Sequence, residues 1–348
     1  MSRSPRWILL AVLAAVLSVT VGVVTSSGRS SKHPDDITTS TTGTTTTKGD
    51  DHGNRGGHGG KRGSVYTIPG DTVFPEGIAL DTSGPGKSFF VSSTTDGTIF
   101  KGAVKGTALA PFAAGGADGR TTATGMTVDR GRLFVSGAGT GKAFVLRTAD
   151  GSTLKVLDTN AGATPTFIND VTVAGGFAYF TDSLRPIIFR ASTSGATVGD
   201  MEPWLDLTGT PFVYKDGFNA NGIVNFDDGR LLVVVQSNTG KLFRIDTRTK
   251  AVSEIGLGGK TLTQGDGLVA HGSRLYVVRN VGEIVEVKLR HGRREGRIGK
   301  TLTSPLFAFP TTAARDGSRL LVVNSQFDKR GPGLTPVLPF TVAQVRKP

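Results

Sequence analysis

The sequence predicts an all-β fold, a six-bladed β-propeller, because one pattern of residues recurs six times along the 348-residue chain. The copies are spaced by 48, 45, 52, 45 and 45 residues, counted between Gly77, Gly125, Asp170, Gly222, Gly267 and Thr312. After each copy come a polar turn and an apolar run, such as SFFVSS, RLFVSG or RLLVVVQS. A period of this length, filled with strand signals, is typical of the blades of a propeller.

Each repeat unit has room for four strands. The first begins at the recurring segment, as in PEGIALD or ANGIVNF, and the second is the apolar run. The third is typified by KAFVLRT and KLFRID, and a weaker fourth by STLKVLD. Gly, Asp and Asn occupy the turns, as tight hairpins require. The second strands are almost continuously apolar, which suits strands that neighbouring blades cover on both faces.

The two ends of the repeat region predict how the ring closes. The sixth unit ends without a fourth strand, whereas SVYTIPG, residues 64–70, stands before the first unit without a partner. We expect this segment to complete the last blade, so that 64–348 form one closed propeller without exposed strand edges at the seam. A pair of β-sandwiches is the alternative, and the equal spacing of whole units favours the propeller.

The first 63 residues differ sharply in composition from the rest. We interpret residues 1–25 as a signal peptide or membrane anchor, because two arginines precede the apolar segment 7–24. Residues 26–63 are rich in Ser, Thr and Gly and predict a disordered linker. We therefore expect an extracytoplasmic propeller, either secreted or tethered to a membrane through 7–24. No clear cleavage site decides between these two forms.

Composition excludes several kinds of site. The chain has no cysteine, so it has no disulfide, no cysteine-based zinc site and no catalytic thiol.

Part of the net charge of +12 lies in KLRHGRREGRIGK, residues 288–300. This run lacks interleaved aromatic residues and is interpreted as a solvated hairpin loop, with weak attraction to an anionic surface as the alternative. We expect a monomer that binds a small molecule and no nucleic acid.

One position in the repeat carries chemical information, the residue just before each spacing marker. These residues are Glu76, Thr124, Asn169, Asn221, Asp266 and Thr311. First strands line the channel of a propeller, so the six side chains should meet at one mouth of that channel. Their oxygen atoms suit Ca²⁺, which takes six to eight oxygen ligands, better than copper or a structural zinc ion. Taken singly, each residue could instead be an ordinary turn former.

Four of the segments, PEGIALD, FINDVTV, NANGIVNF and GDGLVAH, resemble the metal-bearing motifs of the senescence-marker-protein/gluconolactonase family. This family belongs to a superfamily of six-bladed propellers that includes paraoxonases and strictosidine synthase. The resemblance implies metal ligands at Glu76, Asn169, Asn221 and Asp266. It also implies that Asp266 is the catalytic general base of a metal-dependent lactonase.

The sequence departs from this family where substrate is held. Animal sugar-lactonases carry an arginine two residues before the first ligand asparagine, and that position is Phe167 here. The histidine pair of the paraoxonases also has no counterpart. Two hypotheses follow: an extracytoplasmic metal-dependent hydrolase acting on a lactone or related ester, or a non-catalytic propeller that binds a ligand or a surface around a structural metal ion.

Overall fold

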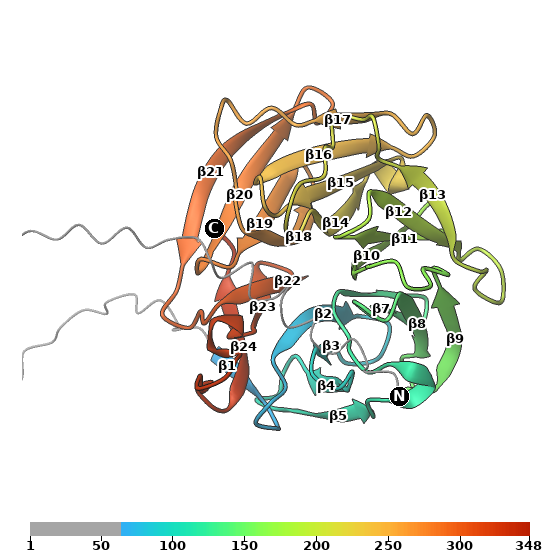
Figure 1. The fold of residues 1–348 in the computed structure, drawn as a ribbon. Coiled ribbons are helices and arrows are strands. Elements are labelled where there is room, and N and C mark those ends of the chain that lie inside the picture. The colour runs from blue at the N-terminus through green and yellow to red at the C-terminus, as the bar shows by residue number, and fades with distance from the viewer. Residues whose placement is uncertain (1–63) are drawn as a thin grey trace, which may run out of the picture. The chain divides into compact units, whose positions relative to one another are not determined.

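The structure, a computed structural model, describes residues 64–348 as a ring of six four-stranded antiparallel sheets (Figure 1). The predicted all-β, six-bladed propeller is therefore confirmed. The predictions for 1–25 and 26–63 fall outside the described residues. Within the described part of the chain, no helix is long and apolar enough to cross a membrane. The only helical elements there are three short 3₁₀ turns, η1 (Ala117–Gly119), η2 (Asp227–Gly229) and η3 (Phe327–Lys329).

Each blade is one repeat unit of four consecutive strands, as the sequence predicts. Blade 1 consists of β2 (Pro75–Asp81), β3 (Ser88–Ser93), β4 (Ile99–Ala103) and β5 (Leu109–Ala113). Blade 2 consists of β6 (Met126–Asp129), β7 (Arg132–Ser136), β8 (Lys142–Arg147) and β9 (Thr153–Asp158). Blade 3 consists of β10 (Ile168–Ala174), β11 (Phe177–Asp182), β12 (Ile187–Ser192) and β13 (Glu202–Asp206).

The second half of the ring repeats this order. Blade 4 consists of β14 (Ala220–Phe226), β15 (Leu231–Gln236), β16 (Lys241–Asp246) and β17 (Val252–Glu254). Blade 5 consists of β18 (Gly265–His271), β19 (Arg274–Arg279), β20 (Glu283–Arg290) and β21 (Glu295–Thr303). Blade 6 consists of β22 (Pro310–Asp316), β23 (Arg319–Asn324), β24 (Phe340–Arg346) and the N-terminal strand β1 (Ser64–Ile68).

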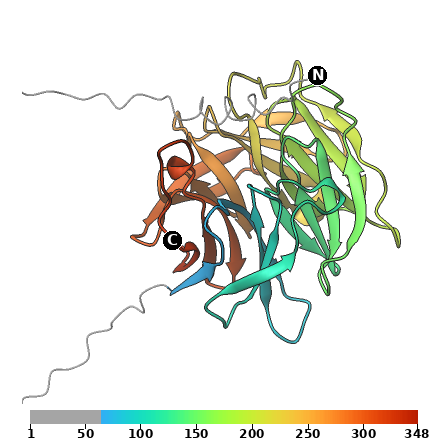
Figure 2. The ribbon, with the colours of Figure 1, turned by 60° about the horizontal axis from the view of Figure 1, so that its bottom comes forward.

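The ring closes through β1, which pairs antiparallel with β24 and forms the outer strand of blade 6 (Figures 1 and 2). The predicted closure by the segment from residue 64 is therefore confirmed. Tyr66 anchors the closing strand: it is 2% exposed, and its hydroxyl donates to the carbonyl of Val104 in blade 1 at 2.7 Å. The same hydroxyl accepts a hydrogen bond from Gln344 of β24 at 2.9 Å. One side chain thus joins the two ends of the repeat region.

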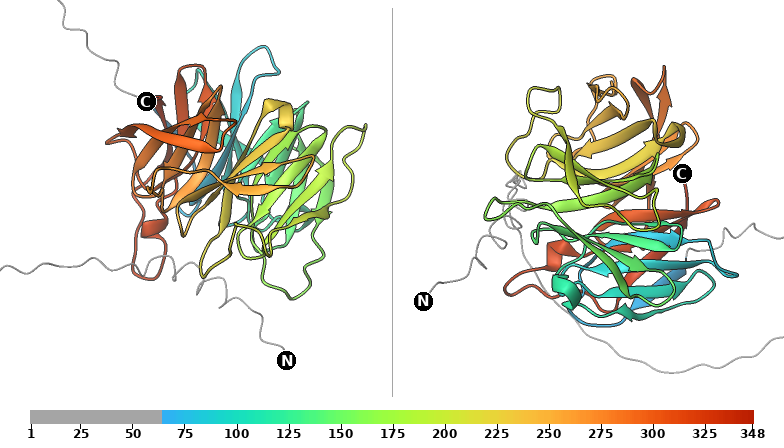
Figure 3. Two further views of the ribbon diagram at one scale, coloured as in Figure 1. Left: turned by 90° about the horizontal axis from the view of Figure 1, so that it is seen from above. Right: turned by 90° about the vertical axis from the view of Figure 1, so that its right-hand side faces the viewer.

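The hydrophobic core is divided among the seams between blades. Six clusters of buried side chains form, and each fills the space between two adjacent sheets. The second strands contribute on both faces, and β15 has every residue buried. This two-sided burial explains their continuous apolar sequence. The views of Figure 3 show the sheets standing side by side around the ring, with loops gathered at its two ends.

The first strands β2, β6, β10, β14, β18 and β22 contact one another in that order and line the central channel. Glycines permit their close approach. A Cβ atom on Gly77 would lie 2.1 Å from the carbonyl oxygen of Thr124, and one on Gly222 would lie 2.2 Å from that of Asp266. The recurring glycine of the sequence pattern is therefore a steric requirement at the contacts between neighbouring blades.

The basic run 288–300 extends beyond the hairpin loop that the sequence predicted. It forms the end of β20, a turn and most of β21, the outer strand of blade 5. Most of its residues are exposed, as expected of solvated charges.

The closing strand gives a test of the fold. Tyr66→Ala should lower the free energy of unfolding by about 3–5 kcal/mol, because it removes a fully buried aromatic side chain and leaves a cavity at the seam. The matched control is Val65→Ala on the same strand, where the side chain is 40% exposed. We expect a change of about 0.5 kcal/mol or less there. Chemical denaturation of residues 64–348 measures both, and equal losses would contradict a clamping role for Tyr66.

Candidate metal site at the channel mouth

The six recurring side chains lie at the starts of the first strands, around one end of the channel. None of the six is more than 7% exposed: they are Glu76, Thr124, Asn169, Asn221, Asp266 and Thr311. In every blade except the second, the ladder between the first and second strands is irregular at this residue. Such bulges re-aim a side chain relative to the regular pleat. We call this end of the ring the mouth face.

Two serines fix the orientation of the asparagine amides. Asn169 donates from Nδ2 to Ser183 Oγ at 2.8 Å, and Ser183 in turn donates to the carbonyl of Ala220 at 2.7 Å. A hydroxyl has one hydrogen, so Ser183 can only accept from Asn169. The contact must therefore involve the amide nitrogen. The oxygen Oδ1 is left on the other side of the carboxamide, away from the serine.

The same device recurs one blade further on. Asn221 donates from Nδ2 to Ser237 Oγ at 2.9 Å, and Ser237 donates to the carbonyl of Gly265. Asn221 Oδ1 is buried and has no hydrogen-bond partner. Two successive blades thus present an amide oxygen whose position is set by a neighbouring hydroxyl.

The two threonines of the ring have a different role from the other four residues. Thr124 Oγ1 lies 2.9 Å from the backbone oxygen of Asn169, and Thr311 Oγ1 donates to that of Glu76 at 3.0 Å. Their hydroxyl hydrogens are directed at the backbone of the next blade. Blades 2 and 6 therefore brace the mouth, while the other four blades carry the carboxylates and amides.

Three carboxyl groups share the channel. Burial raises the pKa of Glu76 well above its ordinary value, and the charges of Asp266 and Asp170 raise it further. Burial also raises the pKa of Asp266 to about 7; the amides of Asn280 and Asn221 oppose this shift, and the charge of Asp170 adds to it. Two of the predicted ligands, Glu76 and Asp266, therefore lie close enough to feel each other's charge.

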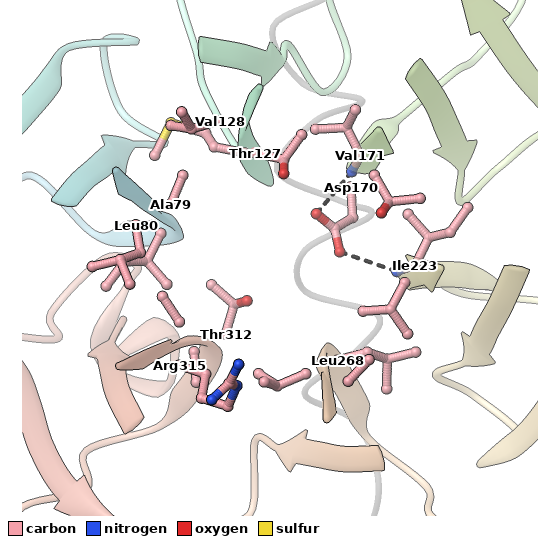
Figure 4. Close-up of a pocket in the computed structure, with 18 residues that line it drawn as sticks. Ala79, Leu80, Thr127, Val128, Asp170, Val171, Ile223, Leu268, Thr312 and Arg315 are labelled. Atoms are coloured by element: carbon pink, nitrogen blue, oxygen red, sulfur yellow. Dashed lines mark hydrogen bonds between the residues drawn. The ribbon is translucent and has the colours of Figure 1, made fainter. Parts of the chain in front are cut away.

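Asp170 directly follows the ring residue Asn169 in β10. Its carboxylate accepts hydrogen bonds from the backbone nitrogens of Val171 at 2.8 Å and Ile223 at 3.1 Å, so it bridges blades 3 and 4 (Figure 4). It projects into a channel cavity of about 240 Å³ on the inner side of the ring. Burial raises the pKa of Asp170 to about 7. Asp170 is therefore a half-buried bridge between two blades within a strand.

Polar residues stand at or just after the ends of the second strands: Ser92, Ser136, Asp182, Gln236, Asn280 and Asn324. The structure buries most of them and ties them into the scaffold; Asp182, for example, accepts from Phe167 N and Arg185 Nε. Asn280 contacts the ring through its side chain, donating to Asp266 Oδ2 at 2.8 Å, and Ser136 does so through its backbone carbonyl, which accepts from Thr124 N at 2.9 Å. The serines one position later, Ser183 and Ser237, were missed. The signal available in the sequence was a serine directly after the last polar residue of the second strand, in TDS (181–183) and in VQS (235–237).

The chemistry of the mouth fits a hard cation. Glu76 Oε2 and Asn221 Oδ1 are among the buried polar atoms that have no hydrogen-bond partner in the described residues. Unpaired buried acceptors are costly, and a cation would satisfy them. Within residues 64–348, no three acidic or histidine side chains gather closely enough to hold a metal ion. A cation at this mouth would therefore need the amide oxygens as ligands.

Comparison with known proteins finds likeness in fold. No protein-family model matches the chain, and no curated protein matches its sequence. The allergen Mala s 1 of Malassezia sympodialis is 15% identical with a TM-score of 0.60, over 81% of this chain and 95% of that one. A gluconolactonase of Xanthomonas campestris is 16% identical with a TM-score of 0.57, over 82% and 90%. A luciferin-regenerating enzyme is 14% identical with a TM-score of 0.57, over 82% and 95%. What is shared is the fold.

The raised pKa of Glu76 predicts a pH effect in metal-free protein. The folded state holds this proton more tightly than the unfolded chain, so Glu76 costs no stability below its ordinary pKa of 4.5 and progressively more as pH rises through the folded value. Glu76→Gln removes the charge. Its stability relative to wild type should therefore increase between pH 4 and pH 8, by more than about 1 kcal/mol.

Denaturation in a chelator at several pH values measures this difference. Asp71→Asn, at an exposed position, is the matched control and should show no such trend. A pH-independent difference between wild type and Glu76→Gln would contradict the buried, charge-coupled state of this carboxyl.

Proposed function

We propose that the propeller is an extracytoplasmic, calcium-dependent hydrolase of a lactone or related ester, and a distant member of the gluconolactonase-like group. One observation carries the proposal: two buried carboxyls and two serine-oriented asparagines surround one channel mouth, and acceptor atoms of Glu76 and Asn221 have no partner. The resemblance of the four motifs and the shared fold with a gluconolactonase support it.

The proposed ligands are Glu76, Asn169, Asn221 and Asp266. When bound there, a calcium ion would act as a Lewis acid that polarises the carbonyl of the ester. Glu76 and Asp266 supply the negative charge that holds the ion. Ser183 and Ser237 keep two neutral amide oxygens in place for it. All four proposed ligand side chains are buried, which strengthens electrostatic interactions with a bound cation.

Asp266 is the proposed general base. Burial raises its pKa to about 7 in the metal-free protein, and a bound cation would lower it again; the proposed role rests on its place beside the ion. Asn280 holds Oδ2 by a hydrogen bond of 2.8 Å, which fixes the carboxylate and leaves Oδ1 to accept a proton from an attacking water. The same Asn280 amide also donates to the carbonyl of Pro310, so its own position is fixed by blade 6.

Metal analysis and a substrate panel test the proposal together. Purified protein should contain about one equivalent of calcium. It should hydrolyse at least one member of a panel of aliphatic, aryl and sugar lactones, and a chelator should abolish that turnover. Lost thermal stability on chelation with no turnover on any lactone would favour the alternative, a binding propeller with a structural ion. Unchanged stability on chelation together with no turnover would contradict both the hydrolase and the structural metal ion.

Substitution of the proposed base gives a sharper outcome. Asp266→Ala should lower kcat by about 10²–10⁴-fold, the usual contribution of a general base. Asp216→Ala is the control, because Asp216 is an exposed carboxylate in the loop before β14 on the same face. Turnover of Asp266→Ala at the wild-type rate would remove Asp266 from the mechanism.

The serines give an independent test of ligand orientation. Ser183→Ala and Ser237→Ala remove the acceptors that hold the two amides, so each amide can rotate and present its nitrogen to the cation. We expect calcium affinity to fall about 10–100-fold, as when an outer hydrogen-bond partner of a metal ligand is lost. Titration calorimetry with calcium measures this loss. Ser152→Ala, in an exposed turn of blade 2, should bind calcium like wild type.

A further inference from the structure

A second cavity, of about 410 Å³, lies in blade 6. We call it the blade-6 pocket. Its walls come from the segment 305–309, which leads into β22, and from the loop 325–339 between β23 and β24. Second strands run antiparallel to first strands, so the loop after β23 lies on the mouth face. The backbone hydrogen bond from Ser325 to Phe309 confirms that the two walls meet there.

The pocket adjoins the ring of the candidate site. Ser325 lies next in sequence to Gln326, which lines the pocket, and its hydroxyl contacts Thr311 Oγ1 at 2.6 Å. Thr311 in turn donates to the backbone of Glu76. Phe309, another lining residue, lies two positions before Thr311. The pocket therefore lies beside the ring, and the buried contact between Ser325 and Thr311 stands between the two.

The buried polar side chains of the pocket already use much of their hydrogen-bonding capacity within the blade. Asn324 accepts from Ala308 N and donates to Leu306 O and Thr341 Oγ1. Gln326 exchanges two hydrogen bonds with the backbone of Val337, each of 2.8 Å. At the edge, Asp328 and Lys329 pair with each other at 3.5 Å. A ligand with many hydroxyls would find few partners here, so its desolvation would be uncompensated.

What the pocket does offer is apolar surface. Leu306, Phe307 and Phe309 line one wall, while Val337 is 72% exposed and Leu338 is 44% exposed on the other. Exposed apolar side chains that gather in one patch commonly mark a binding site, whereas single ones do not. Of the seven exposed large hydrophobic residues in the described chain, five lie in mouth-face loops: Val213, Val281, Leu334, Val337 and Leu338.

A second apolar element stands beside the asparagine ligands. Phe167 lies two residues before Asn169, and Phe218 lies three residues before Asn221. Their rings pack edge to face with centroids 4.9 Å apart. The approaches to the candidate metal site are therefore apolar on blades 3 and 4 as well as on blade 6.

We propose that the blade-6 pocket binds the aliphatic chain of the substrate, so that the enzyme prefers lactones or esters bearing an alkyl or acyl chain over polyhydroxylated sugar lactones. This inference rests on the proposed function for its reaction. Binding of an aliphatic chain by the pocket does not rest on the proposed function, because it depends only on the residues that form the walls. The volume of the pocket falls within the usual range for small-molecule sites.

The experiment uses residues 64–348 and two kinds of probe. Turnover is compared for γ-decalactone, γ-butyrolactone and gluconolactone. Binding of octanol, which has a chain and no hydrolysable bond, is measured by calorimetry. Ala308→Trp fills the pocket from an exposed lining position, and Leu338→Asn makes its wall polar. Leu154→Asn is the control, because Leu154 is 41% exposed on the outer strand of blade 2. Thermal unfolding verifies that each variant is folded.

We expect kcat/KM for γ-decalactone to exceed that for gluconolactone at least tenfold. It should fall about tenfold in Ala308→Trp and Leu338→Asn, as expected for lost contacts in an apolar pocket. Turnover of γ-butyrolactone should stay within about twofold, since it has no chain to place. Octanol binding should weaken in both variants and not in Leu154→Asn.

The outcomes separate the two proposals. Octanol binding that Ala308→Trp abolishes, without turnover of any lactone, would remove the hydrolase and leave the chain-binding pocket. Octanol binding that is absent from wild type or unaffected by both variants would overturn the pocket. Preference for gluconolactone, or equal losses on the short and long lactones in the variants, would also overturn it while leaving the hydrolase.

Discussion

The close approach of neighbouring first strands is the constraint on which the rest of the site depends. At Gly77 and Gly222 the next blade's backbone oxygen lies where a Cβ atom would be. Because of this contact, the residues just before the glycines are brought around a narrow opening, and their side chains are buried. A wider ring would admit water between the blades and leave the same carboxylates solvated. The shifted pKa values of Glu76 and Asp266 are therefore consequences of blade packing as much as of the acids themselves.

The fold could be predicted from the sequence because a propeller is built from local hairpins of one repeated length. Both the blade boundaries and the closing strand at residue 64 followed from counting strands. The ring positions followed from the same register. The roles of individual ring residues did not, since they depend on partners from other strands: Thr124 contacts the backbone of blade 3, whereas Asn169 donates to Ser183 after β11. Contacts between blades depend on which atoms face each other across a seam, and spacing along one strand does not encode this.

The hydrogen bonds around the mouth divide its tasks. Hydroxyl groups carry the connections between blades: Thr124 and Thr311 at two seams, and Ser183 and Ser237 at two others. Each serine both ties its blade to the next and orients an asparagine. The amide of each proposed ligand is thus held by a serine that also joins two neighbouring blades. Loss of such a serine would affect the seam and the site together, so measured cation affinity has to be compared with the measured stability of the same variant.

The apolar surroundings of the mouth link its electrostatics to its selectivity. Burial of Glu76 and Asp266 raises the cost of their charges and strengthens their attraction to a cation. Phe167 and Phe218 on blades 3 and 4 and the apolar walls of the blade-6 pocket offer few partners to the hydroxyls of a sugar. Under the proposed function, a site that gains its charge–charge strength from desolvation would favour substrates that are easily desolvated. An aliphatic chain meets this condition, because its transfer from water is itself favourable.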